Sequence, residues 1–178
     1  MPSHPLIMKD MTSWSTESLG VNAESEFRRV LGHFPTGVVA VTAFDGEPVG
    51  MAIGSFTSIS LQPPLVGFFV DQSSTTFPRI QNAGAFAVNV LAHNQSEVCG
   101  LFGRKGADRF AGLDWEPGHG GAPLLRDALA WIECDLTDVT AVGDHFLAVG
   151  AVRRLSAADE RSPLIFFGGD YRLLRPAS

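Results

Sequence analysis

The sequence predicts a mainly β protein, an antiparallel barrel with short helices. Segments rich in valine and other strand-forming residues outnumber the segments with helical periodicity, and most of them follow one another directly. The few helical segments are short. A doubly wound parallel sheet would need a crossover helix after nearly every strand, so this pattern favours the antiparallel barrel.

Length and composition indicate one folded domain. The chain has 178 residues, of which 45% are hydrophobic and 18% charged, as expected for a globular domain with its own core. We place this domain at residues 22–178. Residues 1–21 mix Ser, Thr, Pro and Met without a period, and we interpret them as a flexible arm able to lie on a partner subunit.

Charge and hydropathy exclude several classes of partner. The net charge of -6 and the pI near 5.2 argue against binding to nucleic acid or to an anionic membrane. No segment approaches the roughly 18 apolar residues of a membrane helix, and the N-terminus lacks the pattern of a signal peptide, so we expect a cytoplasmic protein. Cys99 and Cys134 form no Cys-x-x-Cys, which predicts free thiols rather than a disulfide framework or a zinc site.

The regular structure is expected to begin with a helix and a β-hairpin. Asn22 suits the N-cap of a helix that extends to about Leu31, with an apolar face formed by Phe27, Val30, Leu31 and Phe34. Residues 37–44 are rich in valine and precede Asp45-Gly46, a strong hairpin signal. The partner strand is expected at residues 47–53.

Residues 54–64 alternate hydroxyl-bearing and apolar side chains before two prolines. An extended conformation would place Ser55 and Thr57 on one side, and Phe56, Ser58 and Ser60 on the other. Gly54 permits the close approach of a ligand or of another backbone, and Pro63-Pro64 are expected to end the pairing. The stretch is either the wall of a small-molecule site or an ordinary strand and turn with surface serines.

A hydroxyl-rich loop follows the next expected strand. Residues 65–70 form a continuous apolar run, which predicts a strand buried on both faces. Residues 71–76 are rich in helix-capping side chains, Pro78 suits the first turn of a helix to about Asn82, and Gly84 ends it. The loop and helix start form either an anion site or a plain capped helix.

Two polar features stand out in the following residues. Asn89 is the one polar side chain of an expected strand at residues 85–91, and a buried amide there must either tie down a loop or face a ligand. A helix at residues 95–102 leads into a basic, glycine-punctuated loop at residues 103–110, which suits a phosphate or simple solvation.

The last third of the chain is expected to be an irregular excursion followed by strands. Residues 115–125 are rich in Gly and Pro, and strands are expected at residues 128–139, 148–155 and 163–167. Gly143-Asp144-His145 lies at a turn where a strand begins. His145 there either projects over a pocket or is exposed without a role.

Familiar catalytic signatures are absent from the sequence. There is no Gly-x-Gly-x-x-Gly after the first expected strand, no P-loop, no Gly-x-Ser-x-Gly and no His-Glu-x-x-His, and the five histidines lack the spacing of metal ligands. Many hydroxyls with few candidate acids or bases indicate a protein that binds and orients a cofactor carrying its own chemistry.

An ordered set of motifs from about Phe27 to Tyr171 resembles one family. The set comprises Phe34-Pro35-Thr36-Gly37-Val38, Val49-Gly50-Met51, the run from Ser55 to Leu65, Asp71 with Ser74 and Thr76, the run from Phe86 to Leu91, Lys105 with Asp108 and Phe110, Gly143-Asp144-His145, and Gly169 with Tyr171. These residues are similar to the flavin reductase-like proteins of the FMN-binding split-barrel fold, typified by the reductase components of two-component flavin-dependent monooxygenases.

The resemblance implies roles for individual residues. It implies that the isoalloxazine ring and ribityl chain lie against Gly54, Ser55, Thr57, Ser58 and Ser60. Relatives commonly carry Asn in place of Gly54, so contact at this position would come from the backbone. The loop of Ser74, Thr75 and Thr76 would receive the flavin phosphate, Lys105 and Phe110 would lie near the phosphates or adenine, and His145 would contact the nicotinamide nucleotide. Further cofactor-binding candidates on the matched motifs are Pro35, Thr36, Phe56, Asp71, Asn89 and Tyr171.

The resemblance also implies a split antiparallel barrel, a homodimer with the flavin near its interface, and an NAD(P)H:flavin oxidoreductase. The hydride would pass from the nicotinamide C4 to the flavin N5 of FMN or FAD without a protein nucleophile or metal, and reduced flavin would pass to an oxygenase component. Two alternatives stay open: a flavin carrier or redox sensor without turnover, and a reductase with fixed FMN acting on another substrate.

Overall fold

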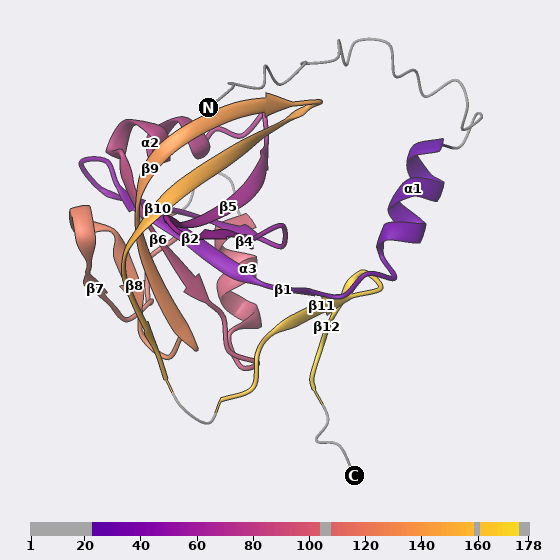
Figure 1. The fold of residues 1–178 in the computed structure, drawn as a ribbon. Helices are drawn as coiled ribbons and strands as arrows, with labels where there is room; N and C mark the ends of the chain where they lie inside the picture. The colour runs from indigo at the N-terminus through magenta and orange to yellow at the C-terminus, as the bar shows by residue number, and fades with distance from the viewer. Residues whose placement is uncertain (1–22, 104–107, 159–160, 175–178) are drawn as a thin grey trace, which may run out of the picture.

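Seven antiparallel strands form the main sheet of the protein, in the spatial order β3-β2-β6-β9-β10-β5-β4. The computed structural model describes residues 23–103, 108–158 and 161–174. In Figure 1 the sheet curls into a barrel, with long β9 and β10 crossing its front. Its strands are β2 (Val39–Phe44), β3 (Pro48–Ile53), β4 (Thr57–Leu61), β5 (Pro64–Asp71), β6 (Ala85–Val90), β9 (Ala130–Val142) and β10 (His145–Ala157). The predicted mainly β, antiparallel barrel is confirmed.

The barrel interior holds the larger of two apolar cores. Phe68 of β5 and Phe86 of β6 are fully buried there, and their rings meet edge-on at 5.6 Å. Phe77 and Ile80 of α2 (Phe77–Ala83) cover one end of this core. A second core lies between β2 and α3 (Ser96–Gly103), and includes Val38, Ala40, Val98, Cys99, Phe102 and Phe110. Alternating strand residues thus pack into one core or the other, which fixes the register of the sheet.

Several local predictions are confirmed. The Asp45-Gly46 turn joins β2 and β3 as a hairpin, and Gly84, at a φ of 69°, ends α2 in the left-handed conformation that favours glycine. The strand containing Asn89 and the helix after it are present as β6 and α3. Asn22, the expected cap of α1 (Ala23–Leu31), and the expected arm at residues 1–21 lie outside the described residues.

The prediction for residues 54–64 was wrong in two respects. A bulge between Ser58 and Ser60 breaks the pairing of β4 with β5, so the expected alternation of sides does not hold through the strand. Pro64 does not end the pairing: it is the first residue of β5 and lies opposite Leu61, with the turn formed by Gln62 and Pro63. A first strand position is one that proline tolerates.

The strand at residues 65–70 is not buried on both faces. Val66, Phe68 and Val70 point into the core, whereas Phe69 is exposed on the outer face. In the sheet β5 lies between β4 and β10, so the outer face at Phe69 is formed by the outward side chains of these three strands.

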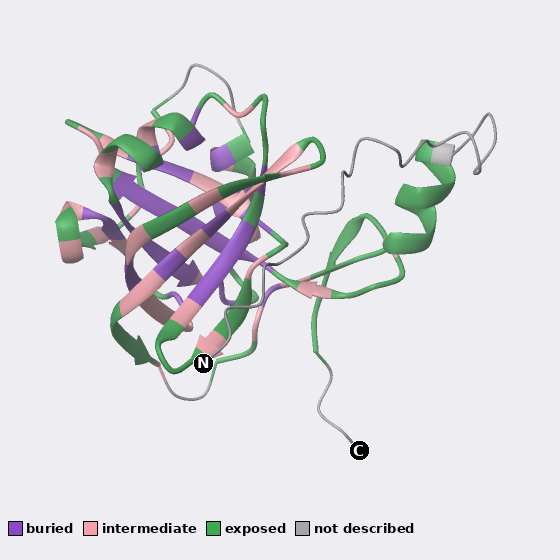
Figure 2. Cartoon of the chain, turned by 45° about the horizontal axis from the view of Figure 1, so that its top comes forward, coloured by how far each residue is buried: buried purple, intermediate pink, exposed green. Residues whose placement is uncertain are grey.

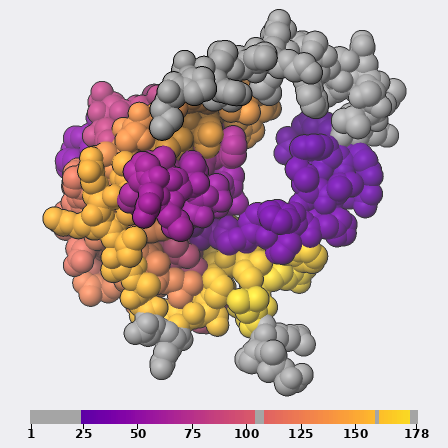
Figure 3. All heavy atoms as spheres, in the orientation of Figure 1, coloured from indigo at the N-terminus to yellow at the C-terminus, as the bar shows by residue number. Residues whose placement is uncertain are grey.

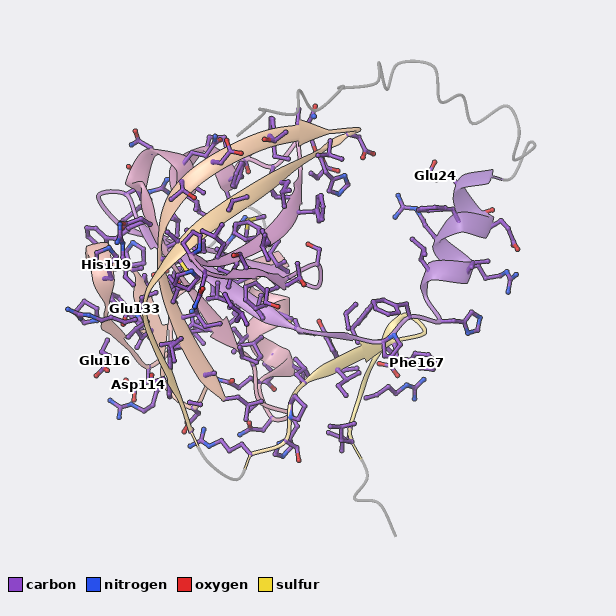
Figure 4. All side chains as sticks on the ribbon, in the orientation of Figure 1. Glu24, Asp114, Glu116, His119, Glu133 and Phe167 are labelled. Carbon is purple, nitrogen blue, oxygen red and sulfur yellow. The ribbon has the colours of Figure 1, made fainter. Side chains whose placement is uncertain are left out.

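The excursion at residues 115–125 is regular rather than irregular. It forms a two-stranded sheet of β7 (Trp115–Pro117) and β8 (Pro123–Leu125), joined by the short helix η3 (His119–Gly121). The backbone N–H of His119 donates to the buried carboxylate of Glu133, and its Nε2 lies 2.6 Å from Asp135. Figure 4 shows His119 and Glu133 together at the edge of the barrel. These bonds hold a Gly- and Pro-rich segment in place although it has few strand-forming residues.

An arm extends from the barrel and carries elements from both ends of the described chain. It consists of α1 and the small sheet of β1 (Thr36–Gly37), β11 (Ile165–Phe167) and β12 (Asp170–Arg172). The Gly168 N–H donates to the Gly32 carbonyl at 2.9 Å, which joins α1 to this sheet. Figure 3 shows α1 standing off the barrel surface, and in Figure 2 the helix is exposed all round.

The apolar face predicted for α1 is present, and no part of the described chain covers it. Phe27 is 58% exposed, Leu31 53% and Phe34 72%. No helix in the described ranges is long and apolar enough to cross a membrane.

Candidate functional site

Thr36 and the glycine at the start of the predicted flavin segment lie side by side. A Cβ atom added to Gly54 would stand 3.2 Å from the Thr36 hydroxyl, so the absence of a side chain lets the two segments approach. Ser55, Thr57 and Ser58 follow Gly54 on the exposed edge of the sheet. The structure thus brings Thr36 to residues 54–58, which the chain separates by a whole hairpin.

Two side chains of this segment make contacts within the protein. The Ser55 hydroxyl donates to the Phe69 carbonyl at 2.9 Å and accepts from the Phe69 N–H at 3.0 Å, which pins the segment to β5. The half-buried Phe56 packs against the barrel core. The Thr57 hydroxyl donates to the Ser58 carbonyl at 3.2 Å and keeps only its acceptor lone pairs for a ligand. The Ser58 hydroxyl is exposed, and Ser60 is half-buried beside it.

Residues 71–76, here called the linking loop, connect two candidate subsites. At its start, Asp71 pairs with His145 across β5 and β10. The Gln72 amide donates to the Gly143 and His145 carbonyls at 3.1 and 3.3 Å, and the Gln72 N–H donates to the Asp144 carbonyl. The predicted histidine turn is therefore fastened to the first two residues of the loop.

The histidine itself is oriented by its neighbour. Nδ1 of His145 lies 2.7 Å from Oδ1 of Asp144 on the protein surface. This hydrogen bond lowers the pKa of Asp144 below its ordinary value. The pKa of Asp71 is also lowered, chiefly by its hydrogen bonds with Ser73. Both carboxylates stay ionised at neutral pH and place negative charge around His145.

The linking loop ends at a cavity. Ser74 Oγ accepts the N–H of Phe77, the first residue of α2, at 3.2 Å. Thr75 and Thr76 line a cavity of about 660 Å³, a size typical of small-molecule sites. Its other lining residues are Glu47, Pro48, Val49, Gly50, Arg79, Asp108, Arg109, Phe110 and Trp115.

Two arginines line this cavity together with the carboxylates of Glu47 and Asp108. Nη1 of Arg109 donates to the Thr76 hydroxyl at 2.7 Å and to the Gly50 carbonyl at 3.1 Å. Arg79 contacts Asp45 at 3.3 Å and Glu47 at 3.0 Å. Hydroxyls and guanidinium groups are suitable ligands for a phosphate, so the residues present fit the phosphate end of a nucleotide.

Asn89 does not face a ligand, and its prediction as a cofactor-binding residue was wrong. It is fully buried in β6. Its amide nitrogen contacts the Ala40 carbonyl at 3.1 Å and the Thr42 hydroxyl at 3.0 Å, and its amide oxygen accepts the Leu125 N–H at 2.7 Å. These bonds tie β8 to the barrel, which is the other of the two roles expected for a buried amide.

The remaining predicted residues have different positions. Phe110 lines the cavity but is only 8% exposed, because its ring packs against Phe102 and Trp115. Tyr171 belongs to the arm and contacts Phe166 and Cys99; burial, followed by the interaction with Cys99, raises its pKa to about 12. Lys105 lies outside the described residues. Pro35 lies in the arm between α1 and β1, next to Thr36.

Sequence reasoning missed Gln72, Arg79, Arg109 and Trp115. Arg109 lies in the basic loop that the sequence singled out, and Arg79 lies in the first turn of the helix after the hydroxyl-rich loop. Nothing in the sequence indicates that these segments converge on β3 and β7. Among the described residues, no group of three or more His, Cys, Asp or Glu side chains is arranged to hold a metal ion.

Comparisons with known proteins agree with this geometry. Residues 31–175 match the family model described as flavin reductase like domain. A flavin reductase from Pseudomonas putida is 50% identical over 147 residues, which cover 82% of this chain and 86% of the relative. The reductase subunit HsaB of a flavin-dependent monooxygenase from Rhodococcus jostii is 45% identical over 151 residues, which cover 84% and 77% of the two chains.

A solved structure with bound ligand fragments has the same fold. The NADH:FAD oxidoreductase SgcE6 of Streptomyces globisporus, in complex with NAD and FAD fragments, superimposes with a TM-score of 0.82 at 38% identity and covers 86% of this chain and 93% of its own. These relationships confirm the predicted barrel fold and the predicted flavin reductase function. The chain belongs to the flavin reductase-like family, as its ordered motifs predicted.

Proposed function

We propose that this chain oxidises NADH or NADPH, reduces FMN or FAD, and releases the reduced flavin to a separate oxygenase component. One observation carries the proposal: the linking loop is fastened to the Gly143-Asp144-His145 turn at one end and lines the arginine-containing cavity at the other. A nicotinamide contact and a phosphate contact on one short loop are what an enzyme needs to align two nucleotides.

The residues that would hold the flavin have suitable chemistry and lie on the exposed segment after Gly54 or at the cavity. The Thr57 and Ser58 hydroxyls and the backbone at Gly54 would face the ring and ribityl chain, while Thr75, Thr76 and Arg109 would hold the phosphate. Bound flavin supplies the hydride-accepting chemistry, and the nicotinamide co-substrate supplies the hydride. The protein's part is to bind and orient, so it needs no nucleophile.

His145 would position the nicotinamide nucleotide through one nitrogen. An ionised Asp144 can only accept a hydrogen bond, so the proton of this pair lies on Nδ1 of His145. Nε2 is then the ring nitrogen available for the nucleotide. An anchored histidine of this kind supports turnover with NAD(P)H over a passive flavin carrier.

Mixing the purified protein with NADH or NADPH and free FMN or FAD tests the activity. We expect the absorbance of the reduced nicotinamide to fall only when flavin is added, at a rate that depends on flavin concentration. If no flavin-dependent oxidation occurs, the protein is a carrier or sensor. If tightly bound FMN supports turnover without added flavin, it is a reductase of another substrate.

We also propose that the enzyme is a homodimer held by its arm. The nine-residue helix α1 exposes Phe27, Val30 and Leu31. Isolated helices shorter than about 12 residues are marginal in water, so a second copy of the chain is the expected cover.

We propose that the enzyme is located in the cytoplasm, in keeping with its two free, buried cysteines.

Light scattering after size exclusion measures this state. A dimer has twice the 19.0 kDa mass of one chain. Leu31→Glu should yield the monomer, whereas Arg28→Gln, on an exposed ion pair of the same helix, should leave the dimer intact. A monomeric wild-type protein would contradict the proposal.

A further inference from the structure

The cavity at the end of the linking loop combines two groups of unlike side chains. Thr76 and Arg109 are hydrogen-bonded to each other and offer donors and positive charge. Phe110 and Trp115 are in ring contact, with centroids 6.1 Å apart, and Trp115, the more exposed of the two, offers an apolar aromatic surface. At about 660 Å³ the cavity is far larger than a single phosphate requires.

We propose that this cavity binds the adenosine diphosphate half of FAD and that Trp115 is the platform for its adenine, which makes the enzyme select FAD over FMN. The inference rests on the proposed function, because it extends the phosphate site of the same flavin. FMN ends at its phosphate, so only FAD can use the aromatic part of the cavity.

Trp115 is the aromatic side chain best placed for this role. It is half-buried, and it borders both the 660 Å³ cavity and a neighbouring cavity of about 400 Å³. Trp131, the other described tryptophan, donates its indole N–H to the Leu125 carbonyl, whereas within the described ranges the Trp115 indole N–H has no such partner. Phe110 is only 8% exposed, so it supports Trp115 from behind rather than facing a ligand.

The carboxylates of the cavity also indicate a nucleoside rather than a bare phosphate. Glu47 and Asp108 line the same space as the two arginines. Glu47 is paired with Arg79, and one oxygen of Asp108 accepts the Phe110 N–H. A carboxylate has further lone pairs, and it is a good acceptor for ribose hydroxyls. The cavity thus has the parts of an adenosine diphosphate site. Hydroxyl and guanidinium groups can donate to phosphate, carboxylates can accept from ribose, and an aromatic ring can stack on a base.

NADH also contains adenosine diphosphate, so the experiment must separate the two sources. Dissociation constants for FAD and FMN would be measured by the quenching of flavin fluorescence in wild-type protein, in Trp115→Leu and in Trp115→Phe. Trp131→Leu is the control, since Trp131 lines the neighbouring cavity. ADP alone would be titrated against tryptophan fluorescence, and the KM for NADH would be measured with FMN as acceptor.

We expect wild-type protein to bind FAD more tightly than FMN, and Trp115→Leu to weaken FAD by roughly tenfold, as loss of one base-stacking contact does. The effect on FMN should be clearly smaller, and Trp115→Phe should keep part of the preference. ADP should quench wild-type but not Trp115→Phe fluorescence, and should compete with FAD and, through the phosphate subsite that the two flavins share, with FMN as well.

Three results would overturn the assignment: equal losses for FAD and FMN, an unchanged FAD affinity, or a rise in the KM for NADH with an unchanged FAD to FMN ratio, which would give the adenosine site to NADH. Should Trp115→Leu fail to fold, Trp115→Phe and the ADP titration still decide. The proposed function fails separately, if the wild-type protein binds neither flavin or oxidises neither NADH nor NADPH.

Discussion

Asp144 and His145 form a hydrogen-bonded pair, with Oδ1 of the carboxylate 2.7 Å from Nδ1 of the ring. The bond joins neighbours on a tight turn, and Gln72 holds both of their backbone carbonyls from the linking loop. The ring is thus held at Nδ1 and the backbone of His145 is fastened to the loop, while Nε2 is left for a ligand. A histidine held in this way should act on binding more than on the chemical step.

His145→Ala should raise the KM for NADH or NADPH by roughly tenfold, the usual effect of losing one hydrogen bond to a charged or polar ligand. The affinity for flavin should stay nearly unchanged. Steady-state kinetics with each substrate varied in turn separate the two effects, and the exposed His93→Ala is the control. A comparable loss for both substrates would remove His145 from its assigned role.

Thr76→Val should weaken FMN and FAD alike, by roughly tenfold. The substitution keeps the side-chain shape but removes the hydroxyl that accepts from Arg109 at 2.7 Å and faces the cavity. Flavin fluorescence titration measures both affinities. Thr137→Val, an exposed threonine on β9, provides the matched control. Unchanged affinities would mean that the flavin phosphate does not bind at the linking loop.

Asn89→Ala should lower the free energy of unfolding by about 2 to 3 kcal/mol, because the Leu125 N–H and the partners of the amide nitrogen would be left buried and unpaired. Urea unfolding followed by fluorescence measures this change. The flavin affinity of the folded variant should match that of the wild type. Weaker flavin binding with unaltered stability would restore the ligand-binding role that the structure excludes.

Alkaline pH should destabilise the fold through Cys134. Burial raises the pKa of this thiol from 9.0 to about 12. The unfolded chain therefore releases the proton first, and stability that is present below pH 9.0 is lost as the pH rises toward about 12.

Relative to Cys134→Ala, the wild-type protein should lose about 1.4 kcal/mol per pH unit in this window. Urea unfolding at several pH values measures the difference, and Cys99 and Tyr171, whose pKa values are also raised, contribute equally to both proteins. Parallel curves for the two proteins would mean that Cys134 ionises as readily in the folded state as in the unfolded chain.

The sequence was most informative where local chemistry decides the structure. The Asp45-Gly46 hairpin, the glycine that ends α2 and the alternation of β6 all depend on neighbours in the chain. It was least informative where tertiary contacts decide. The strands β7 and β8 have only three residues each, and they persist because His119 is bonded to Glu133 and Asp135.

The candidate site divides in the same way. Thr75, Thr76 and His145 lie in motifs that the sequence displays, and the structure places Thr75 and Thr76 at the cavity and His145 at the other end of the linking loop. Arg79 and Trp115 reach the cavity only because α2 and β7 fold against β3, and no local pattern reports this. Asn89 shows the converse, since a polar residue in an apolar strand signals partners without saying whether they are protein or ligand.

The double attachment of the linking loop limits how the enzyme can be redesigned. Gln72 and Thr76 are four positions apart, yet one is bonded to the histidine turn and the other to the wall of the cavity. A substitution between them will disturb both nucleotides together, so the loop is a poor target for changing coenzyme preference alone. Variant libraries that select for NADH over NADPH should change residues near Asp144, and those that select for FMN over FAD should change residues near Trp115. Both should keep residues 71–76 constant.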